Sequence, residues 1–291
     1  MSMHLTLNST FELNNGNRIP VLGLGVFRAP SGEITRNAVR TACEYGYRHF
    51  DTARAYCNEK SVGRGLKDSG LRRSEFFVTT KLWRSDWDNP RRGLEESLKR
   101  LDLDYVDLYL LHWPFKGFEK AWRVLEELQQ EGLTRNIGVS NFKIHHLKEL
   151  KASGATVRPQ INQVECHPAN AENELLKYCT ERGIVLTAYS PLGGMGRTLT
   201  DDPRLTSLAA YYKVTPAQLI LRWNLQRGVA VIPKSVRPER IEENSRLFHF
   251  EISPDDMDTI DSVNADERRA YDSDLIDTRP EASFPVLTEE T

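Results

Sequence analysis

The stretch VDLYLLHWP, residues 106–114, decides the fold of this chain. It is an almost continuous apolar run that ends in the imidazole of His112, and parallel strands buried on both faces have this pattern. Toward the N-terminus, FFVTTKLW carries Lys81 near its end, and HFDTARAYCNEK carries Asp51 and Tyr56. Each strand-like run therefore ends in polar groups, and in a parallel barrel such ends meet on one face.

Short apolar runs alternate with amphipathic segments along the whole chain. Eight such units in 291 residues predict an α/β fold, a (β/α)8 TIM barrel. The predicted strands are Val21–Gly25, His49–Asp51, Phe77–Lys81, Val106–Leu111, Asn136–Val139, Ile161–Glu165, Val185–Tyr189 and Val229–Ile232. The clearest predicted helices are Asn89–Leu101, Glu119–Glu131, Ile144–Ala152 and Glu172–Arg182.

Two segments do not fit this repeat. Phe11–Asn15 and Asn17–Ile19 flank a glycine in the turn sequence NGN, which predicts an N-terminal β-hairpin that forms the floor of the barrel. Near the other end, Pro254–Val263 predicts an extra helix, followed by a polar tail. No linker divides the chain, so we expect residues 1–291 to form one domain. From about residue 266 the tail should cover the barrel mouth or be partly flexible.

Charge and composition exclude several classes of function. A net charge of −2 and a pI near 6.4 give no electrostatic footprint for nucleic acid or a membrane surface. The sequence has no apolar stretch long enough to span a bilayer and no basic leader before an apolar run. The four cysteines are scattered and show no C-x-x-C pair, which is typical of reduced thiols. We therefore expect a monomeric cytoplasmic protein.

The polar groups at the strand ends suit the protonation of a carbonyl oxygen. A tyrosine has an ordinary pKa near ~10 and is a poor proton donor at neutral pH. An ammonium from Lys81 would lower the pKa of Tyr56, and Asp51 would hold Lys81 charged. His112 could donate a hydrogen bond to a substrate oxygen and orient it. The set fits carbonyl reduction, and because no side chain supplies a hydride, a cofactor must.

Each of these residues also has an ordinary structural interpretation. Asp51 could cap a helix, Tyr56 could lie in a surface loop, and Lys81 could be a solvated strand end. His112 could be a buried, hydrogen-bonded imidazole. The chemical interpretation depends on finding all four at the ends of three successive predicted strands.

Eight motifs in a fixed order resemble those of a known family. They are GLGVF (23–27), HFDTARAYCNE (49–59), TTKLW (79–83), LLHWP (110–114), GVSNF (138–142), INQVECHP (161–168), AYSPLG (188–193) and IPKSVRPERIEEN (232–244). Over nearly its whole length the chain resembles the aldo-keto reductase superfamily. Its short loops are most similar to the bacterial and protozoal branch, which includes 2,5-diketogluconate reductase and prostaglandin F synthase-like members.

The resemblance implies reduction of aldehydes and ketones with NADPH, in which Tyr56 is the general acid, Lys81 and Asp51 tune it, and His112 orients the carbonyl. It implies a small-molecule carbonyl substrate that contacts Phe27, Tyr56, Trp83, His112 and Trp113. The implied contacts to the nicotinamide are Ser140, Asn141 and Gln163 on the carboxamide and Tyr189 on the ring. Ser190, Leu192 and Gly193 match the pyrophosphate loop. The adenosine and 2′-phosphate site of the family is matched by Lys234, Ser235, Val236, Arg240, Glu243 and Asn244. Arg237 adds a positive charge there. The remaining implied cofactor contacts are Val26, Phe27 and Asp51.

The sequence is open to four other interpretations. A Rossmann dehydrogenase needs a third glycine after Gly23-Leu24-Gly25, and this chain lacks it. A TIM-barrel aldolase could use Lys81 as a Schiff-base amine, but it would not need Tyr56. A regulatory subunit could bind the nicotinamide cofactor without significant turnover, and only an activity measurement separates it from an enzyme. A metal enzyme is disfavoured because His145 and His146 are adjacent and should point in different directions.

Overall fold

The computed structural model describes residues 5–194 and 198–279. Eight parallel strands form its barrel: β3 (Leu24–Gly25), β4 (His49–Asp51), β5 (Phe77–Leu82), β6 (Val106–Leu111), β7 (Thr134–Ser140), β8 (Ile161–Glu165), β9 (Val185–Tyr189) and β10 (Ala230–Val231). They pair in sequence order from β3 to β10, and isolated bridges from Leu22 to Val231 and from Gly25 to Lys234 close the ring. The predicted (β/α)8 barrel is confirmed.

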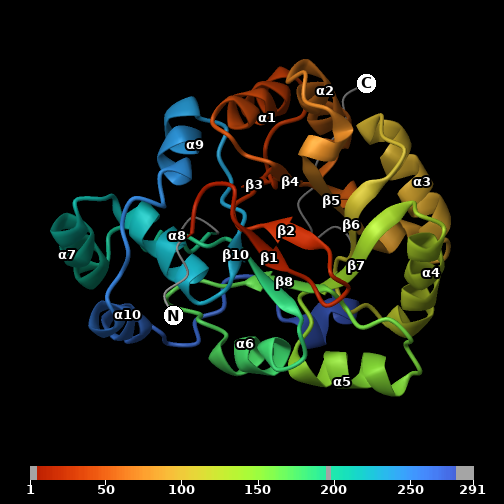
Figure 1. The fold of residues 1–291 in the computed structure, drawn as a ribbon. Coiled ribbons are helices and arrows are strands. Elements are labelled where there is room, and N and C mark those ends of the chain that lie inside the picture. Colours follow the sequence, from red (N-terminus) through yellow and green to blue (C-terminus); the bar gives the residue numbers. More distant parts are fainter. Residues whose placement is uncertain (1–4, 195–197, 280–291) are drawn as a thin grey trace.

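Helices surround the barrel on its outside (Figure 1). They are α1 (Glu33–Glu44), α2 (Glu59–Asp68), α3 (Pro90–Leu101), α4 (Phe118–Gln130), α5 (Ile144–Ala152), α6 (Asn173–Thr180), α7 (Pro203–Tyr212), α8 (Pro216–Gln226), α9 (Pro238–Ser245) and α10 (Pro254–Asp261). The 3₁₀ turns are η1 (Arg54–Tyr56), η2 (Arg73–Glu75), η3 (Arg84–Asp86) and η4 (Ser273–Thr278). Within the described part of the chain, no helix is both long and apolar enough to cross a membrane.

The strands at the closure, β3 and β10, are shorter than the sequence pattern predicted. Their backbones approach each other so closely that a Cβ atom at Gly25 would lie 2.7 Å from the carbonyl oxygen of Ile232. Single backbone hydrogen bonds join the two sides, such as the one that Gly23 donates to Val231 at 2.8 Å. Glycine is required here because only it lacks a Cβ atom.

The N-terminal hairpin, β1 (Thr10–Glu12) and β2 (Arg18–Pro20), covers the end of the barrel that faces the reader in Figure 1. The prediction of the hairpin is confirmed, but its strand bounds were wrong, because residues 13–17 form a longer loop. Asparagines in that loop also hydrogen-bond to the barrel. Asn15 donates to the side chain of Asn136 at 2.9 Å, and Asn14 donates to the carbonyl of Pro159 at 2.9 Å.

The segment from residue 266 to 279 crosses the opposite end of the barrel. Glu165, the last residue of β8, accepts backbone hydrogen bonds from Arg269 at 2.9 Å and Ala270 at 2.8 Å. Lys143, before α5, donates to Asp272 at 2.6 Å and to Asp274 at 2.7 Å. These contacts fix the segment over the strand ends. The remainder of the predicted tail, residues 280–291, lies outside the described residues.

Two histidines on α5 also contact this segment. The rings of His145 and His146 lie 4.0 Å apart, and their Nε2 atoms lie 2.9 and 3.4 Å from Asp274. The expectation that adjacent histidines point in different directions was therefore wrong, because a carboxylate from another segment draws both rings to one point. Lys143 donates to the same carboxylate, so the ammonium group of a lysine shares this cluster.

Candidate active site

The four residues singled out in the sequence converge at one end of the barrel. Asp51 ends β4, Lys81 lies in β5, and His112 directly follows β6. Tyr56 closes the short turn η1 after β4. All four side chains are buried or nearly so, from 0% exposed at Lys81 to 9% at Tyr56.

Lys81 connects the acidic and phenolic groups. Its ammonium donates three hydrogen bonds, to Asp51 at 2.5 Å, to the carbonyl oxygen of Thr52 at 2.8 Å and to the hydroxyl of Tyr56 at 3.2 Å. A lysine ammonium has three N–H donors, so all of them are used. Because the Tyr56 oxygen accepts from Lys81, its own O–H bond points elsewhere and can donate to another atom.

The acidity of Tyr56 differs from the sequence-based prediction. Burial raises the pKa of the Tyr56 phenol well above its usual range, and the negative charge of Asp51 adds to the rise. The predicted lowering by Lys81 was wrong for the protein alone, because removing a phenolate from water costs more than the neighbouring ammonium returns. Tyr56 therefore stays protonated at neutral pH, which is the state that a proton donor requires.

His112 is held among aromatic rings at the same end of the barrel. Its ring contacts Tyr56 edge-on at 5.6 Å and Trp83 at 5.1 Å between centroids. Burial lowers the pKa of His112 well below its usual value, and the charge on Lys81 lowers it further. The imidazole is therefore neutral, so one ring nitrogen can donate a hydrogen bond and the other can accept one.

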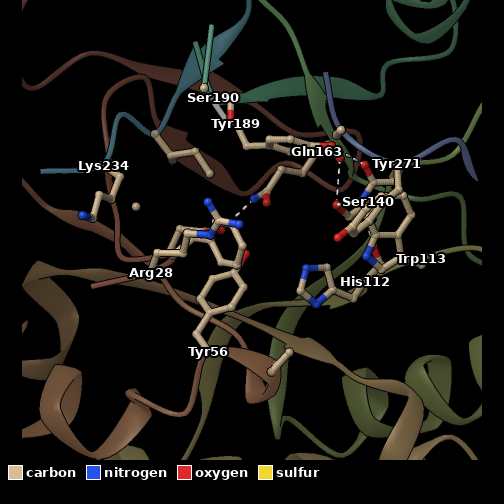
Figure 2. Close-up of a pocket in the computed structure, with 18 of the residues that line it drawn as sticks. Arg28, Tyr56, His112, Trp113, Ser140, Gln163, Tyr189, Ser190, Lys234 and Tyr271 are labelled. Carbon is tan, nitrogen blue, oxygen red and sulfur yellow. Dashed lines mark hydrogen bonds between the residues drawn. The ribbon is translucent and has the colours of Figure 1, made fainter. Parts of the chain in front are cut away.

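A cavity of about 580 Å³ opens in front of these residues. In Figure 2, Lys234 and Arg28 lie on one side of it, and His112, Trp113 and Tyr271 lie on the other. All five residues predicted to contact the substrate line this cavity: Phe27, Tyr56, Trp83, His112 and Trp113. The structure therefore brings the predicted aromatic wall and the predicted proton donor together.

The residues predicted to bind the nicotinamide also line the cavity. Ser140 and Tyr189 are the last residues of β7 and β9, and Gln163 is the central residue of β8. Asn141 directly follows β7, and Ser190 and Leu192 follow β9. Tyr189 donates to the side chain of Asn141 at 2.7 Å, and Asn141 donates to the carbonyl of His112 at 2.9 Å. Amide groups beside an aromatic ring fit a ligand ring that carries an amide group. Lys234, which lines the same cavity, fits phosphates joined to that ring.

The other predicted cofactor residues lie outside this cavity. Ser235, Val236 and Arg237 form the turn that leads into α9, where the Ser235 hydroxyl accepts from the backbone of Arg237 at 3.1 Å. On α9 lie Arg240, Glu243 and Asn244, and Glu243 accepts a hydrogen bond from Thr215 at 2.6 Å. Gly193 accepts from Arg269 at 2.9 Å. Val26 is buried in the core and does not line the cavity.

The cavity lining also includes residues that were not predicted from the sequence, among them two arginines and two residues of the segment that crosses the mouth. Arg28 follows Phe27 in a left-handed conformation with φ 57°, and Arg54 lies in η1 beside Tyr56. Ala270 and Tyr271 come from the segment that crosses the mouth. The position of Arg54 in the motif HFDTARAYC was a usable signal, because a charged residue two positions before Tyr56 lies near it in any short turn. No signal in the sequence pointed to residues 270 and 271 individually.

Comparisons with known proteins agree with this geometry. The model of the aldo/keto reductase family matches residues 21–265. Glyoxal reductase of Bacillus subtilis is 47% identical over 269 residues, which cover 91% of this chain and 96% of that protein. Glycerol 2-dehydrogenase (NADP(+)) of Saccharomyces cerevisiae is 40% identical, with 88% of this chain and 91% of that protein covered.

A solved structure gives the same result for the fold. An aldo-keto reductase from a deep-sea metagenome library of the Medee basin superposes with a TM-score of 0.87 at 41% identity. The match covers 91% of this chain and 98% of that one.

Proposed function

The chain belongs to the aldo/keto reductase family, and we propose that it reduces aldehydes and ketones to alcohols with NADPH, using Tyr56 as the general acid. One observation carries this proposal. The hydroxyl of Tyr56 faces a cavity while it accepts a 3.2 Å hydrogen bond from Lys81, which leaves its proton available to a ligand. Membership of the family makes the chain an oxidoreductase; the cofactor and the acid are our proposal.

The cofactor, when bound, supplies a hydride to the carbonyl carbon. Tyr56 donates its proton to the carbonyl oxygen, so the C=O bond becomes a CH–OH group. Lys81 lies beside the phenol oxygen as negative charge develops there, and Asp51 neutralises Lys81. His112, neutral because of its burial, donates a hydrogen bond that orients the carbonyl oxygen.

NADPH is proposed over NADH because cationic residues lie where a 2′-phosphate could bind. Lys234 lines the cavity, and Arg240 lies in the first turn of α9, where the helix dipole also favours an anion. A yeast relative is named as NADP(+)-dependent. Tyr189 would stack on the nicotinamide ring, and Ser140, Asn141 and Gln163 would bind its carboxamide.

The aromatic walls of the cavity favour small to medium carbonyl compounds, and a related protein is named for glyoxal. The test is NADPH oxidation, followed at 340 nm, with glyoxal, methylglyoxal, aromatic aldehydes, aldoses and diketogluconate. We expect turnover of at least one small aldehyde. NADPH binding without turnover of any of these compounds would favour the regulatory subunit instead. We also expect the chain to act as a monomer in the cytoplasm.

A further inference from the structure

The cavity carries an excess of positive charge. Among the described residues that line it, three are cationic, Arg28, Arg54 and Lys234, and one carries a carboxylate, Asp51. Asp51 is already neutralised, because it accepts hydrogen bonds from Lys81 at 2.5 Å and from Gln163 at 2.6 Å. Within the described lining the cationic side chains therefore outnumber the carboxylates, and Asp86, whose carboxylate lies beside Arg54, is outside the lining.

These cations are not all at the same place. Lys234 and Arg28 lie on the side of the cavity away from Trp113 and Tyr271 (Figure 2). The phosphates of the proposed cofactor account for a cation at Lys234. Arg54 lies instead beside the proposed proton donor, because the single turn η1 carries both Arg54 and Tyr56, two residues apart.

The surroundings of Arg54 hold its side chain at the mouth. Its Nε atom lies 3.6 Å from a carboxylate oxygen of Asp86, and the Arg54 side chain is 29% exposed. Asp86 lies in η3, next to Ser85, which lines the cavity together with Trp83. A guanidinium that is partly buried and oriented by a carboxylate is well suited to bind another planar anion.

We propose that Arg54 binds an anionic oxygen group, a carboxylate or phosphate, on the carbonyl substrate, and that the preferred substrates are therefore carbonyl compounds that carry such a group. This inference rests on the proposed function, because Arg54 selects the molecule whose carbonyl group Tyr56 protonates. The anionic group itself is unchanged by the reaction. Hydride and proton are added only to the carbonyl group.

The test compares substrates that differ in charge at one position. The pairs are 4-carboxybenzaldehyde with its methyl ester, and 4-formylphenyl phosphate with its dimethyl ester, at low ionic strength with NADPH. A charge-assisted hydrogen bond typically corresponds to a factor of about 10 to 150. We expect the kcat/KM of the wild-type protein for a charged compound to exceed that for its ester by about this factor. Because exposed charges are screened, the ratio should fall with added salt.

Arg54→Met should reduce the ratio of kcat/KM between a charged compound and its ester to near one, chiefly by raising the KM for the charged compound. Arg54→Lys should keep part of this ratio. Arg84→Met is the matched control, because Arg84 lies nearby in η3 but donates to the carbonyl of Arg279 instead of lining the cavity. It should keep the wild-type ratio. Turnover of the esters by each variant shows that the variant is folded.

Two results would overturn the inference alone: ester turnover by the wild-type protein with a ratio near one, or a full ratio in Arg54→Met. Loss of the ratio in Arg84→Met as well would show a general effect of charge at the mouth and would also overturn the assignment to Arg54. Absence of turnover with all four compounds and with glyoxal would overturn the proposed function, and this inference with it. A preference confined to the carboxylate pair or to the phosphate pair would support the site and identify its ligand.

Discussion

The side-chain amide of Gln163 donates a 2.6 Å hydrogen bond to the carboxylate of Asp51. Gln163 was predicted as a contact of the nicotinamide, and Asp51 as a partner of the catalytic lysine. The bond therefore joins the two halves of the site across the barrel, from β8 to β4. Burial raises the pKa of Asp51, while Lys81 and the Gln163 amide oppose that rise.

Replacing Gln163 with leucine should consequently affect stability even without a cofactor. A hydrogen bond to a buried charged group contributes about 1.5–3 kcal/mol. We expect Gln163→Leu to lower the free energy of unfolding in urea by this amount and also to weaken NADPH binding. An unchanged unfolding midpoint would show that the bond to Asp51 contributes no net stability.

Tyr56→Phe should remove turnover and keep cofactor binding. The phenol is the proposed proton donor, and general acid catalysis typically contributes about 100- to 10,000-fold. NADPH oxidation measures the loss, and quenching of tryptophan fluorescence by NADPH measures binding. Tyr211→Phe, at an exposed tyrosine of α7, is the control and should retain full activity. A Tyr56→Phe variant with more than about a tenth of the wild-type rate would reject the assignment.

His112→Ala should slow the chemical step much more than it weakens the cofactor. The neutral imidazole is proposed to orient the carbonyl, so its loss affects the geometry of the reacting groups. Single-turnover kinetics with saturating NADPH separates this step from binding. Equal single-turnover rates in variant and wild type would mean that His112 is only a packing residue between Tyr56 and Trp83.

Those residues of the site that lie at the ends of buried strands could be predicted from the sequence. The run before His112 was recognisable because β6 is buried almost throughout and so is nearly continuously apolar. The two short strands β3 and β10 were not delimited, because a close backbone approach at Gly25, and not side-chain pattern, decides where they pair. The raised pKa of Tyr56 depends on burial, which a sequence does not display. The place of Arg54 near Tyr56 could have been expected from the motif HFDTARAYC, but the direction of its side chain depends on its contact with Asp86, which comes from another turn.

A buried histidine should make the stability depend on pH. Burial lowers the pKa of His49 to about 3, with a further contribution from Lys81, whereas an unfolded histidine has a pKa of about 6.5. Below pH 6.5 the unfolded chain binds a proton that the folded protein does not. The contribution of His49 to stability is therefore complete above pH 6.5 and falls by roughly 1.4 kcal/mol per pH unit toward pH 3.

Urea unfolding at pH 7, 6 and 5 measures this slope. His49→Gln can still reach Thr79, which the ring of His49 contacts at 3.0 Å, and it should give a shallower dependence than the wild-type protein. His249→Gln, at an exposed histidine, should keep the wild-type slope. Parallel curves for wild type and His49→Gln would show that another group causes the loss.

Cofactor preference should depend on Arg240. NADPH differs from NADH by a 2′-phosphate, and Arg240 is exposed in the first turn of α9 without an ion pair to any described residue. A charge-assisted hydrogen bond contributes about 1.5–3 kcal/mol, so Arg240→Ala should weaken NADPH binding by about 10- to 150-fold and leave NADH binding almost unchanged. Fluorescence titration with both cofactors measures this, and the difference should shrink with salt.

Arg246→Ala, which removes an exposed pairing with Glu242 at the far end of α9, is the control and should alter neither affinity. Equal losses for the two cofactors in Arg240→Ala would show that the side chain supports the helix and does not bind the phosphate, and equal affinities in the wild-type protein would overturn the choice of NADPH.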